Sequence, residues 1–91
     1  MQFRWDPRKA KTNARKHGVS FEEAITVFLD DLARIHDDTA HSIGEVREII
    51  IGTSAFGRII LVCFTERGDI VRIINAREPD AVERYDYEEN L

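Results

Sequence analysis

Three short apolar runs form the middle of the chain, and all of them are rich in Ile and Val. Short segments that contain Ser, Gly or a Gly-Asp pair separate these runs. β-Branched runs of this length, joined by Gly-containing loops, are typical of an antiparallel meander. The pattern therefore predicts three consecutive strands at Val46–Gly52, Arg58–Phe64 and Ile70–Ala76.

The N-terminal part of the chain carries helix signals. Asp6 is a suitable N-cap and Pro7 suits the first helical position, so we expect a helix that starts here. This helix should run to about His17 and stop at Gly18. Before it, residues 2–5 alternate polar and aromatic side chains, which predicts a short strand or an extended lead-in.

A second helix is expected directly after the first. Ser20 and Glu23 match the capping-box pattern, and the helix should extend to about Leu29. Its expected apolar face consists of Phe21, Ala24, Ile25 and Phe28. Leu32–His36 then predicts another strand, which a polar loop connects to the meander.

Asp80 and Glu83 repeat the capping-box pattern and predict a last helix that runs to about Glu89. This helix is acidic, and Val82 and Tyr85 are its expected apolar anchors. The order of elements predicts an α+β domain. We expect a small antiparallel sheet of about four strands, with the two N-terminal helices packed on it and a short C-terminal helix.

Composition narrows the class of protein. The chain has 91 residues, of which 43% are hydrophobic and 33% charged, as expected for one folded domain spanning residues 1–91. No apolar run approaches the roughly 20 residues of a membrane span. The N-terminus lacks the apolar segment of a secretory signal, so we expect a cytoplasmic protein. Cys63, the one cysteine, lies in an apolar run and is expected to be a small buried hydrophobe.

The net charge of −4 hides a strong segregation of charge along the chain. Residues 1–17 carry +5, residues 18–42 carry −5, residues 43–77 carry +1 and residues 78–91 carry −5. A nucleic-acid-binding protein is ordinarily basic overall. Any polyanion should therefore meet a local patch formed by the first helix and the arginines of the sheet. The acidic parts equally suit a basic partner protein.

Motifs exclude several kinds of chemistry. There is no phosphate-binding Gly loop, and the histidines at 17, 36 and 41 lack metal-ligand spacing, so we expect no metal and no cofactor. The remaining Arg, Lys, His and Glu side chains suit metal-independent RNA cleavage. In that reaction a base takes the proton of a 2′-hydroxyl, cations hold the charge on the phosphorane, and an acid protonates the leaving 5′-oxygen.

Several side chains fit these roles, each beside a structural alternative. Glu45 and Arg47, two apart in a predicted strand, would share a face about 6.6 Å apart and bracket a phosphate, or form a simple ion pair. Arg72 interrupts an apolar strand and fits either a cleft or a solvated face. His17 lies on a stripe of small residues and fits either catalysis or core packing. Further RNA contacts are predicted from Lys11, Arg15, Arg58 and Tyr87.

Several blocks of the sequence resemble the BrnT family of toxins. The most specific combination is Lys-His-Gly-Val-Ser-Phe at residues 16–21 together with Arg-Ile-Ile-x-Ala-Arg at residues 72–77. The resemblance covers nearly the whole chain. Its other parts are Phe3 with Trp5-Asp6-Pro7, Lys11-Thr12-Asn13, Gly44-Glu45-Val46-Arg47, Ile51-Gly52, Thr65-Glu66-Arg67-Gly68, Glu83 and Tyr87.

This resemblance implies a RelE-like fold and a ribonuclease toxin of a type II toxin–antitoxin pair that blocks translation. It implies RNA as substrate and, as partner, a BrnA antitoxin with a ribbon-helix-helix domain. DNA is then contacted only through the antitoxin complex, which represses its own operon. The active-site set that the resemblance favours is Lys16, His17, Glu45, Arg47, Arg72 and Arg77.

Roles within this set are a hypothesis. We assign Glu45 as the base and the three arginines to the phosphate, with His17 or Lys16 as the acid. A second function stays open, that of a non-catalytic module which pairs with its antitoxin and serves only in operon repression. The completeness of the active-site set favours the nuclease, and the acidic C-terminal part favours the second function.

Overall fold

The structure is a computed structural model that describes all residues, 1–91. It consists of five strands, three α-helices and two short 3₁₀-helices. The strands are β1 (Gln2–Arg4), β2 (Arg34–Asp37), β3 (Glu48–Thr53), β4 (Ile59–Arg67) and β5 (Ile70–Arg77). The helices are α1 (Pro7–His17), α2 (Phe21–Thr26) and α3 (Ala81–Glu89), with 3₁₀-helices η1 (Val27–Leu29) and η2 (Thr39–His41).

The strands form one mixed sheet in the order β1-β5-β4-β3-β2. The predicted antiparallel meander is confirmed as β3, β4 and β5, and β2 adds to it in antiparallel fashion. The prediction of about four antiparallel strands was incomplete, because β1 is a fifth strand and pairs with β5 in parallel. Phe3 fixes this strand by packing its ring on that of Phe28, with centroids 5.0 Å apart.

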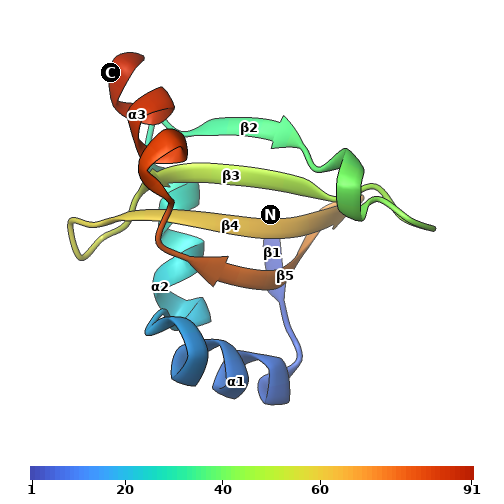
Figure 1. Ribbon diagram of the computed structural model, residues 1–91. Coiled ribbons are helices and arrows are strands. Elements are labelled where there is room, and N and C mark those ends of the chain that lie inside the picture. Colours follow the sequence, from blue (N-terminus) through green and yellow to red (C-terminus); the bar gives the residue numbers. More distant parts are fainter.

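The helices lie on both sides of the sheet. Figure 1 shows α2 behind the sheet and α3 in front of it, with α1 along the edge next to β5. The hydrophobic core lies between the sheet and α2 with η1, and contains Val19, Phe21, Ala24, Val27, Ile50, Ile60, Val62, Phe64, Val71, Ile73 and Ala76. Gly52 allows η1 to approach the sheet, because a Cβ there would lie 3.0 Å from Val27 Cγ1 and 2.9 Å from the Ala33 Cβ just beyond η1. No helix is long and apolar enough to cross a bilayer.

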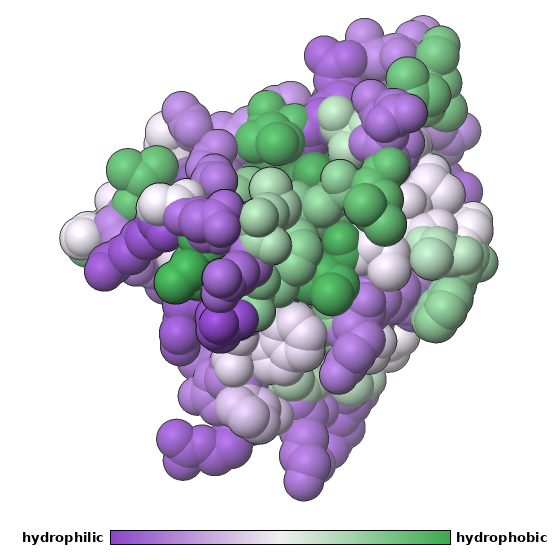
Figure 2. All heavy atoms as spheres, turned by 180° about the vertical axis from the view of Figure 1, so that it is seen from behind, coloured by the Kyte–Doolittle hydropathy of each residue, from purple (hydrophilic) through white to green (hydrophobic).

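The back of the molecule is apolar at its surface as well. Figure 2 shows hydrophobic side chains gathered in the middle of this face, with hydrophilic side chains around them. Leu29 at the end of η1 and Leu32 just after it are both exposed. The charged side chains that suit a polyanion must therefore be sought at the margin of this face or on the other side of the sheet.

A β-bulge controls which way the arginines of β5 point. The register between β4 and β5 shifts at Cys63/Phe64, so that β5 has one extra residue, Ile74. Residues on either side of the bulge, Ile73 and Ala76, both face the core although they are three positions apart. The bulge therefore allows Arg72 and Arg77, which are five positions apart, to face away from the core together.

The loop before β3 differs from the prediction. The strand was expected to start at Val46 but starts at Glu48, so Glu45 and Arg47 do not share a strand face. The backbone of Arg47 is instead bonded within the loop, because its N–H donates to Ser42 Oγ at 3.0 Å and its carbonyl accepts from the Asp38 N–H at 2.8 Å. These bonds hold the loop closed.

The predicted ends of the first and last helices are confirmed. The Asp6 carboxylate accepts from the Arg8 N–H at 2.9 Å, and Gly18 ends α1 with φ of 68°. Asp80 and Glu83 form the complete capping box at the start of α3. Ser20 caps α2 through the Glu23 N–H at 3.0 Å. The Glu23 carboxylate, however, does not complete a box.

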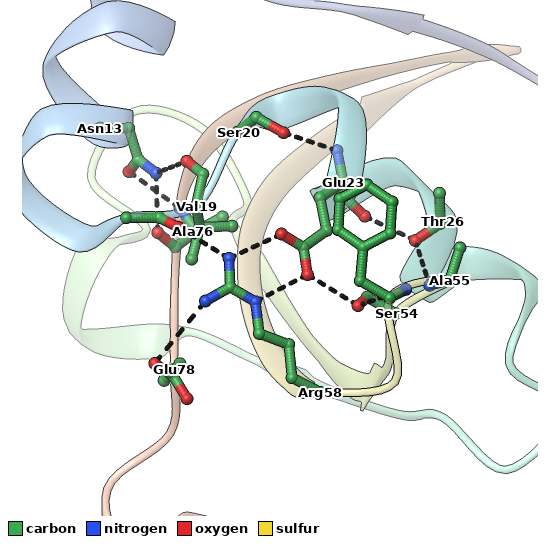
Figure 3. Close-up of polar contacts among 12 residues, drawn as sticks. Asn13, Val19, Ser20, Glu23, Thr26, Ser54, Ala55, Arg58, Ala76 and Glu78 are labelled. Atoms are coloured by element: carbon green, nitrogen blue, oxygen red, sulfur yellow. Dashed lines mark hydrogen bonds and ion pairs between the residues drawn. The ribbon is translucent and has the colours of Figure 1, made fainter.

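The Glu23 carboxylate is buried and binds Arg58 instead (Figure 3). Arg58 Nε and Nη2 donate to its two oxygens at 2.8 and 2.7 Å, and Ser54 Oγ donates at 2.7 Å. The Arg58 guanidinium holds the pKa of Glu23 below its usual value. Arg58 Nη2 also donates to the Gly18 carbonyl at 2.7 Å. One arginine, just before β4, thus joins the start of this strand to α2 and the end of α1.

The attachment of α3 also differs from the prediction. Val82 and Tyr85, the expected anchors, are 71% and 63% exposed, whereas Tyr87 is only 2% exposed. The Tyr87 hydroxyl donates to Asp30 Oδ2 at 2.6 Å and lies 3.0 Å from Thr53 Oγ1. These bonds fasten the last turn of α3 to the sheet.

Cys63 is buried, as predicted. Burial, together with the nearby Asp38 carboxylate, raises the pKa of the thiol to about 11. Because the thiolate is the nucleophilic form, Cys63 is a packing residue in the folded protein.

Replacing Arg58 by Ala should destabilise the protein by about 3 kcal/mol, because the buried Glu23 carboxylate would lose its cation. The matched control is Arg84→Ala, which removes an exposed ion pair with Glu88 and should cost no more than about 0.5 kcal/mol. Urea unfolding measures both values. Equal losses of unfolding free energy would show that the buried Arg58–Glu23 pair stabilises the protein no more than an exposed ion pair.

Replacing Tyr87 by Phe should lower the free energy of unfolding by about 1–2 kcal/mol, because the hydroxyl bonds to Asp30 and Thr53 are lost. Tyr85→Phe is the control on the same helix and should be neutral, since that side chain is exposed. Thermal unfolding followed by circular dichroism distinguishes the two. A larger loss of stability in the Tyr85 variant would show that Tyr85, as predicted from the sequence, attaches α3 to the protein.

Candidate active site: a cationic cleft between α1 and β5

The side chain of Asn13 attaches α1 to the edge of β5. Strand β1 pairs only with the first part of β5, at residues 70–72, and leaves the backbone beyond it uncovered. Asn13 Oδ1 accepts from the Ala76 N–H at 3.0 Å, and Asn13 Nδ2 donates to the Ala76 carbonyl at 2.8 Å. Nδ2 also donates to the Val19 carbonyl at 3.0 Å (Figure 3). The amide thus replaces a neighbouring strand.

A cleft of about 620 Å³ opens between α1 and β5. Positions three, four and seven apart lie on one face of a helix, which explains why Lys9, Thr12, Asn13 and Lys16 share this cleft. From β5, the residues after the bulge complete it. The lining residues are Asp6, Arg8, Lys9, Thr12, Asn13, Lys16, His17, Ile74, Asn75 and Arg77.

The cleft is electropositive. Its cations are Arg8, Lys9, Lys16 and Arg77, and its one acid, Asp6, accepts hydrogen bonds as the N-cap of α1. Of these cations, Lys16 lies in the last turn of α1, where the helix dipole favours positive charge. The excess of cations over acids suits an anionic ligand.

Arg77 is the cation that the sheet contributes. Its two terminal nitrogens donate to the two carboxylate oxygens of Glu83, both at 2.9 Å. This bidentate pair holds the pKa of Glu83 below its usual value and raises the pKa of Arg77. Arg77 thus lines the cleft with its guanidinium held by a carboxylate of α3.

His17 lies half-buried in the wall of the cleft, on the last turn of α1. The sequence left two alternatives, a catalytic histidine and a packed core histidine. The structure places the side chain in the same cleft as Lys16 and Arg77 and outside the core cluster. Histidine can both take and give a proton near neutral pH, so the cleft combines cations with a proton-transfer group.

The other predicted active-site residues lie elsewhere. Glu45 and Arg72 line a second cleft of about 450 Å³, with Arg4, Thr65, Arg67 and Ile70. Along β5, the distance between Arg72 and Arg77 is roughly 15 Å. Arg47 lines neither cleft and is paired with Glu45, its Nε 3.4 Å from Glu45 Oε1. The six predicted residues therefore do not converge on one phosphodiester.

Two of the four predicted RNA contacts, Arg58 and Tyr87, are engaged within the fold. The guanidinium of Arg58 is bound to Glu23 and the Gly18 carbonyl, and the ring of Tyr87 is buried, so neither suits RNA. Lys11 lines a small groove with Trp5 on another side of α1, and Arg15 is exposed outside both the cleft and this groove. RNA contacts from Lys11 and Arg15 stay predictions.

The sequence analysis missed several residues of the cleft. Lys9, Thr12 and Asn13 were recognisable, because they lie seven, four and three positions before Lys16 on a predicted helix. Asn75 was not, because its exposure depends on the bulge in β5. No group of three or more His, Cys, Asp or Glu side chains is placed to hold a metal ion.

These features define a class of protein. It is a small α+β domain with a five-stranded mixed sheet, whose edge helix and outer strand together present a cationic cleft with a histidine to an anionic ligand.

The chain belongs to the BrnT family, the ribonuclease toxins of type II toxin–antitoxin systems, and residues 5–83 match the family. This confirms the resemblance predicted from the sequence, and a type II system implies an antitoxin partner. Among solved structures, the chain is similar to the 1.1 Å crystal structure of the Brucella abortus ribonuclease toxin BrnT. The two share 29% identity over 88% of this chain and 97% of the other, with a TM-score of 0.70. The comparison with curated proteins found no match.

Proposed function

We propose that this protein cleaves RNA, without a metal, in the cleft between α1 and β5. The observation that carries the proposal is that Lys16, His17 and Arg77 line one cleft, which joins two cations and a histidine. Family membership supplies the reaction class, that of a ribonuclease toxin. The site residues are our assignment.

The reaction fits these side chains. The 2′-oxygen of a ribose attacks the adjacent phosphorus while the bond from phosphorus to the 5′-oxygen breaks, which leaves a 2′,3′-cyclic phosphate and a 5′-hydroxyl. Lys16 and Arg77 offset the negative charge that grows on the phosphorane. Arg77 suits this role because its planar fork matches two phosphate oxygens. To reach them, the fork must be shared with, or released by, Glu83.

Proton transfer is assigned to the same cleft. His17 in its neutral form takes the proton of the 2′-hydroxyl, and the Lys16 ammonium gives a proton to the departing 5′-oxygen. This replaces the assignment of Glu45 as the base, because Glu45 lies in the other cleft and is paired with Arg47 and Arg67.

In the cell, the cleavage is proposed to block translation until an antitoxin binds. We propose that this antitoxin carries a ribbon-helix-helix domain, as the family resemblance implies, and that the complex contacts operator DNA only through it. The RelE-like relationship of the fold stays a prediction.

A second function, the non-catalytic module, is favoured by one observation. Arg77 is held by both of its terminal nitrogens to Glu83, and the helix that carries Glu83 is acidic. If Glu83 keeps this cation from RNA, the protein acts only through its antitoxin. In the nuclease, Arg77 contacts the RNA phosphate; in the non-catalytic module, it stays bound to Glu83.

His17→Ala should lower the rate of RNA cleavage by about 10²–10⁴-fold, and Arg77→Ala by about 10²–10³-fold. Cleavage is measured on a fluorescent RNA in the presence of EDTA, with circular dichroism to verify folding. Arg84→Ala, an exposed arginine of α3, is the control and should cleave at the rate of the unchanged protein. Full activity of the His17 variant, or activity only with added metal, would contradict the mechanism.

Glu83→Gln should raise the affinity for RNA, because it frees Arg77 from a carboxylate while a Gln can still accept from the Asp80 N–H. Fluorescence anisotropy with a non-cleavable 2′-O-methyl RNA measures the change. Glu88→Gln, which removes an equal charge elsewhere on α3, is the control. An equal gain in both variants would indicate general electrostatics, and no gain would show that Glu83 does not restrict Arg77.

A further inference from the structure

Two arginines lie side by side on neighbouring strands, one on β1 and one on β5. Arg4 pairs with Arg72 in the parallel register of these strands, so the two side chains leave the same side of the sheet. The neighbouring pair, Phe3 with Val71, fixes this direction, because both of these side chains pack at the core. The two guanidiniums therefore share one patch of surface.

Neither guanidinium has an acidic partner. The hydrogen bonds of Arg4 go to its neighbours, Gln2 Oε1 and the Phe3 carbonyl, and Arg72 forms no ion pair. Like charges directly opposite each other in a sheet are destabilising. A structure that keeps such a pair unneutralised is suited to an anion that binds between the two side chains.

The pair lines a cleft whose charge suits such an anion. The second cleft, of about 450 Å³, is lined by Arg4 and Arg72, with Arg67 as a third cation. Its one acid, Glu45, is shared between Arg67 and Arg47, at 3.6 and 3.4 Å. Three arginines against one divided carboxylate leave the cleft positive.

The same strand leads from this cleft to the proposed active site. Arg72 stands at one end of β5 and Arg77 at the other, and Asn75 between them is exposed and lines the first cleft. Arg72 and Arg77 are roughly 15 Å apart along the strand, more than one phosphate of a nucleic acid backbone can bridge. An extended chain of phosphates matches two cationic clefts on one strand.

We propose that Arg4, Arg67 and Arg72 form a second phosphate site, which binds the RNA away from the bond that is cut. This inference rests on the proposed function of the first cleft. It assigns Arg72 to substrate binding rather than to the reacting phosphate. An acidic protein segment is the competing ligand. We favour RNA, because its regularly spaced phosphates match both this cleft and the cleft that contains Lys16 and Arg77.

The test measures how binding depends on RNA length. A non-cleavable 2′-O-methyl RNA of about ten nucleotides should reach both clefts, whereas a dinucleotide fills only one. Arg4→Ala and Arg72→Ala should each weaken binding of the long RNA by about tenfold. Each should also reduce the dependence of log K on log salt by about 0.7. Their affinity for the dinucleotide, read from competition with a labelled long RNA, should change far less. Arg84→Ala is the matched control.

Folding is checked separately, because removal of either arginine relieves a like-charge contact. Both variants should melt at or above the temperature of the unchanged protein. Inorganic phosphate should stabilise the unchanged protein more than either variant, since a ligand of the folded state raises its stability.

The outcomes separate this inference from the proposed function. Length-dependent loss of RNA binding supports the second site even if cleavage assays on the unchanged protein are negative. Equal loss for both RNAs, or no loss for the long one, would overturn it. Stabilisation by phosphate without any effect on RNA would mean an adventitious ion only. Binding of a poly-glutamate peptide in preference to RNA would assign the cleft to an acidic protein segment and also overturn it.

Discussion

Three hydrogen bonds of one amide hold the proposed active site together. Asn13 occupies the place of a neighbouring strand beside Ala76 and also binds the Val19 carbonyl just after α1. Arg58 binds the Gly18 carbonyl in the same segment. Because buried polar groups must find partners, this segment can take few other positions. The fixed end of α1 keeps His17 in the same cleft as Arg77.

The arrangement of charges explains how an acidic chain can present cationic clefts. The fold places the acidic last helix next to the first cleft, where Glu83 neutralises Arg77. It places Glu45 beside the second cleft, between two arginines. Each carboxylate lowers the repulsion among the cations of its cleft but leaves some of these cations without an acidic partner. Net charge is therefore a poor guide to the ligand of this protein, and local charge is a better one.

Local signals predicted much of the fold, and contacts distant in sequence decided the rest. The caps at Asp6, Gly18 and Asp80 depend on their own neighbours in the chain, and all three form as expected. Glu23 shows the limit of this reasoning, because its local partner would be the helix N-terminus, whereas a guanidinium 35 positions away binds it instead. A charged hydrogen bond to a buried carboxylate outweighs one more capping bond.

The candidate site shows the same division. Lys9, Thr12, Asn13 and Lys16 follow the helical period of α1, whereas Lys16 and His17 were predicted from the family resemblance. The sheet part of the site depends on the extra residue in β5. With strict alternation, side chains five positions apart point to opposite faces. Arg72 and Arg77 could then not both point away from the core. Either the first cleft would lose Arg77, or the second cleft would lose Arg72. A one-residue bulge, invisible in the apolar pattern, thus determines whether both arginines can meet one extended ligand.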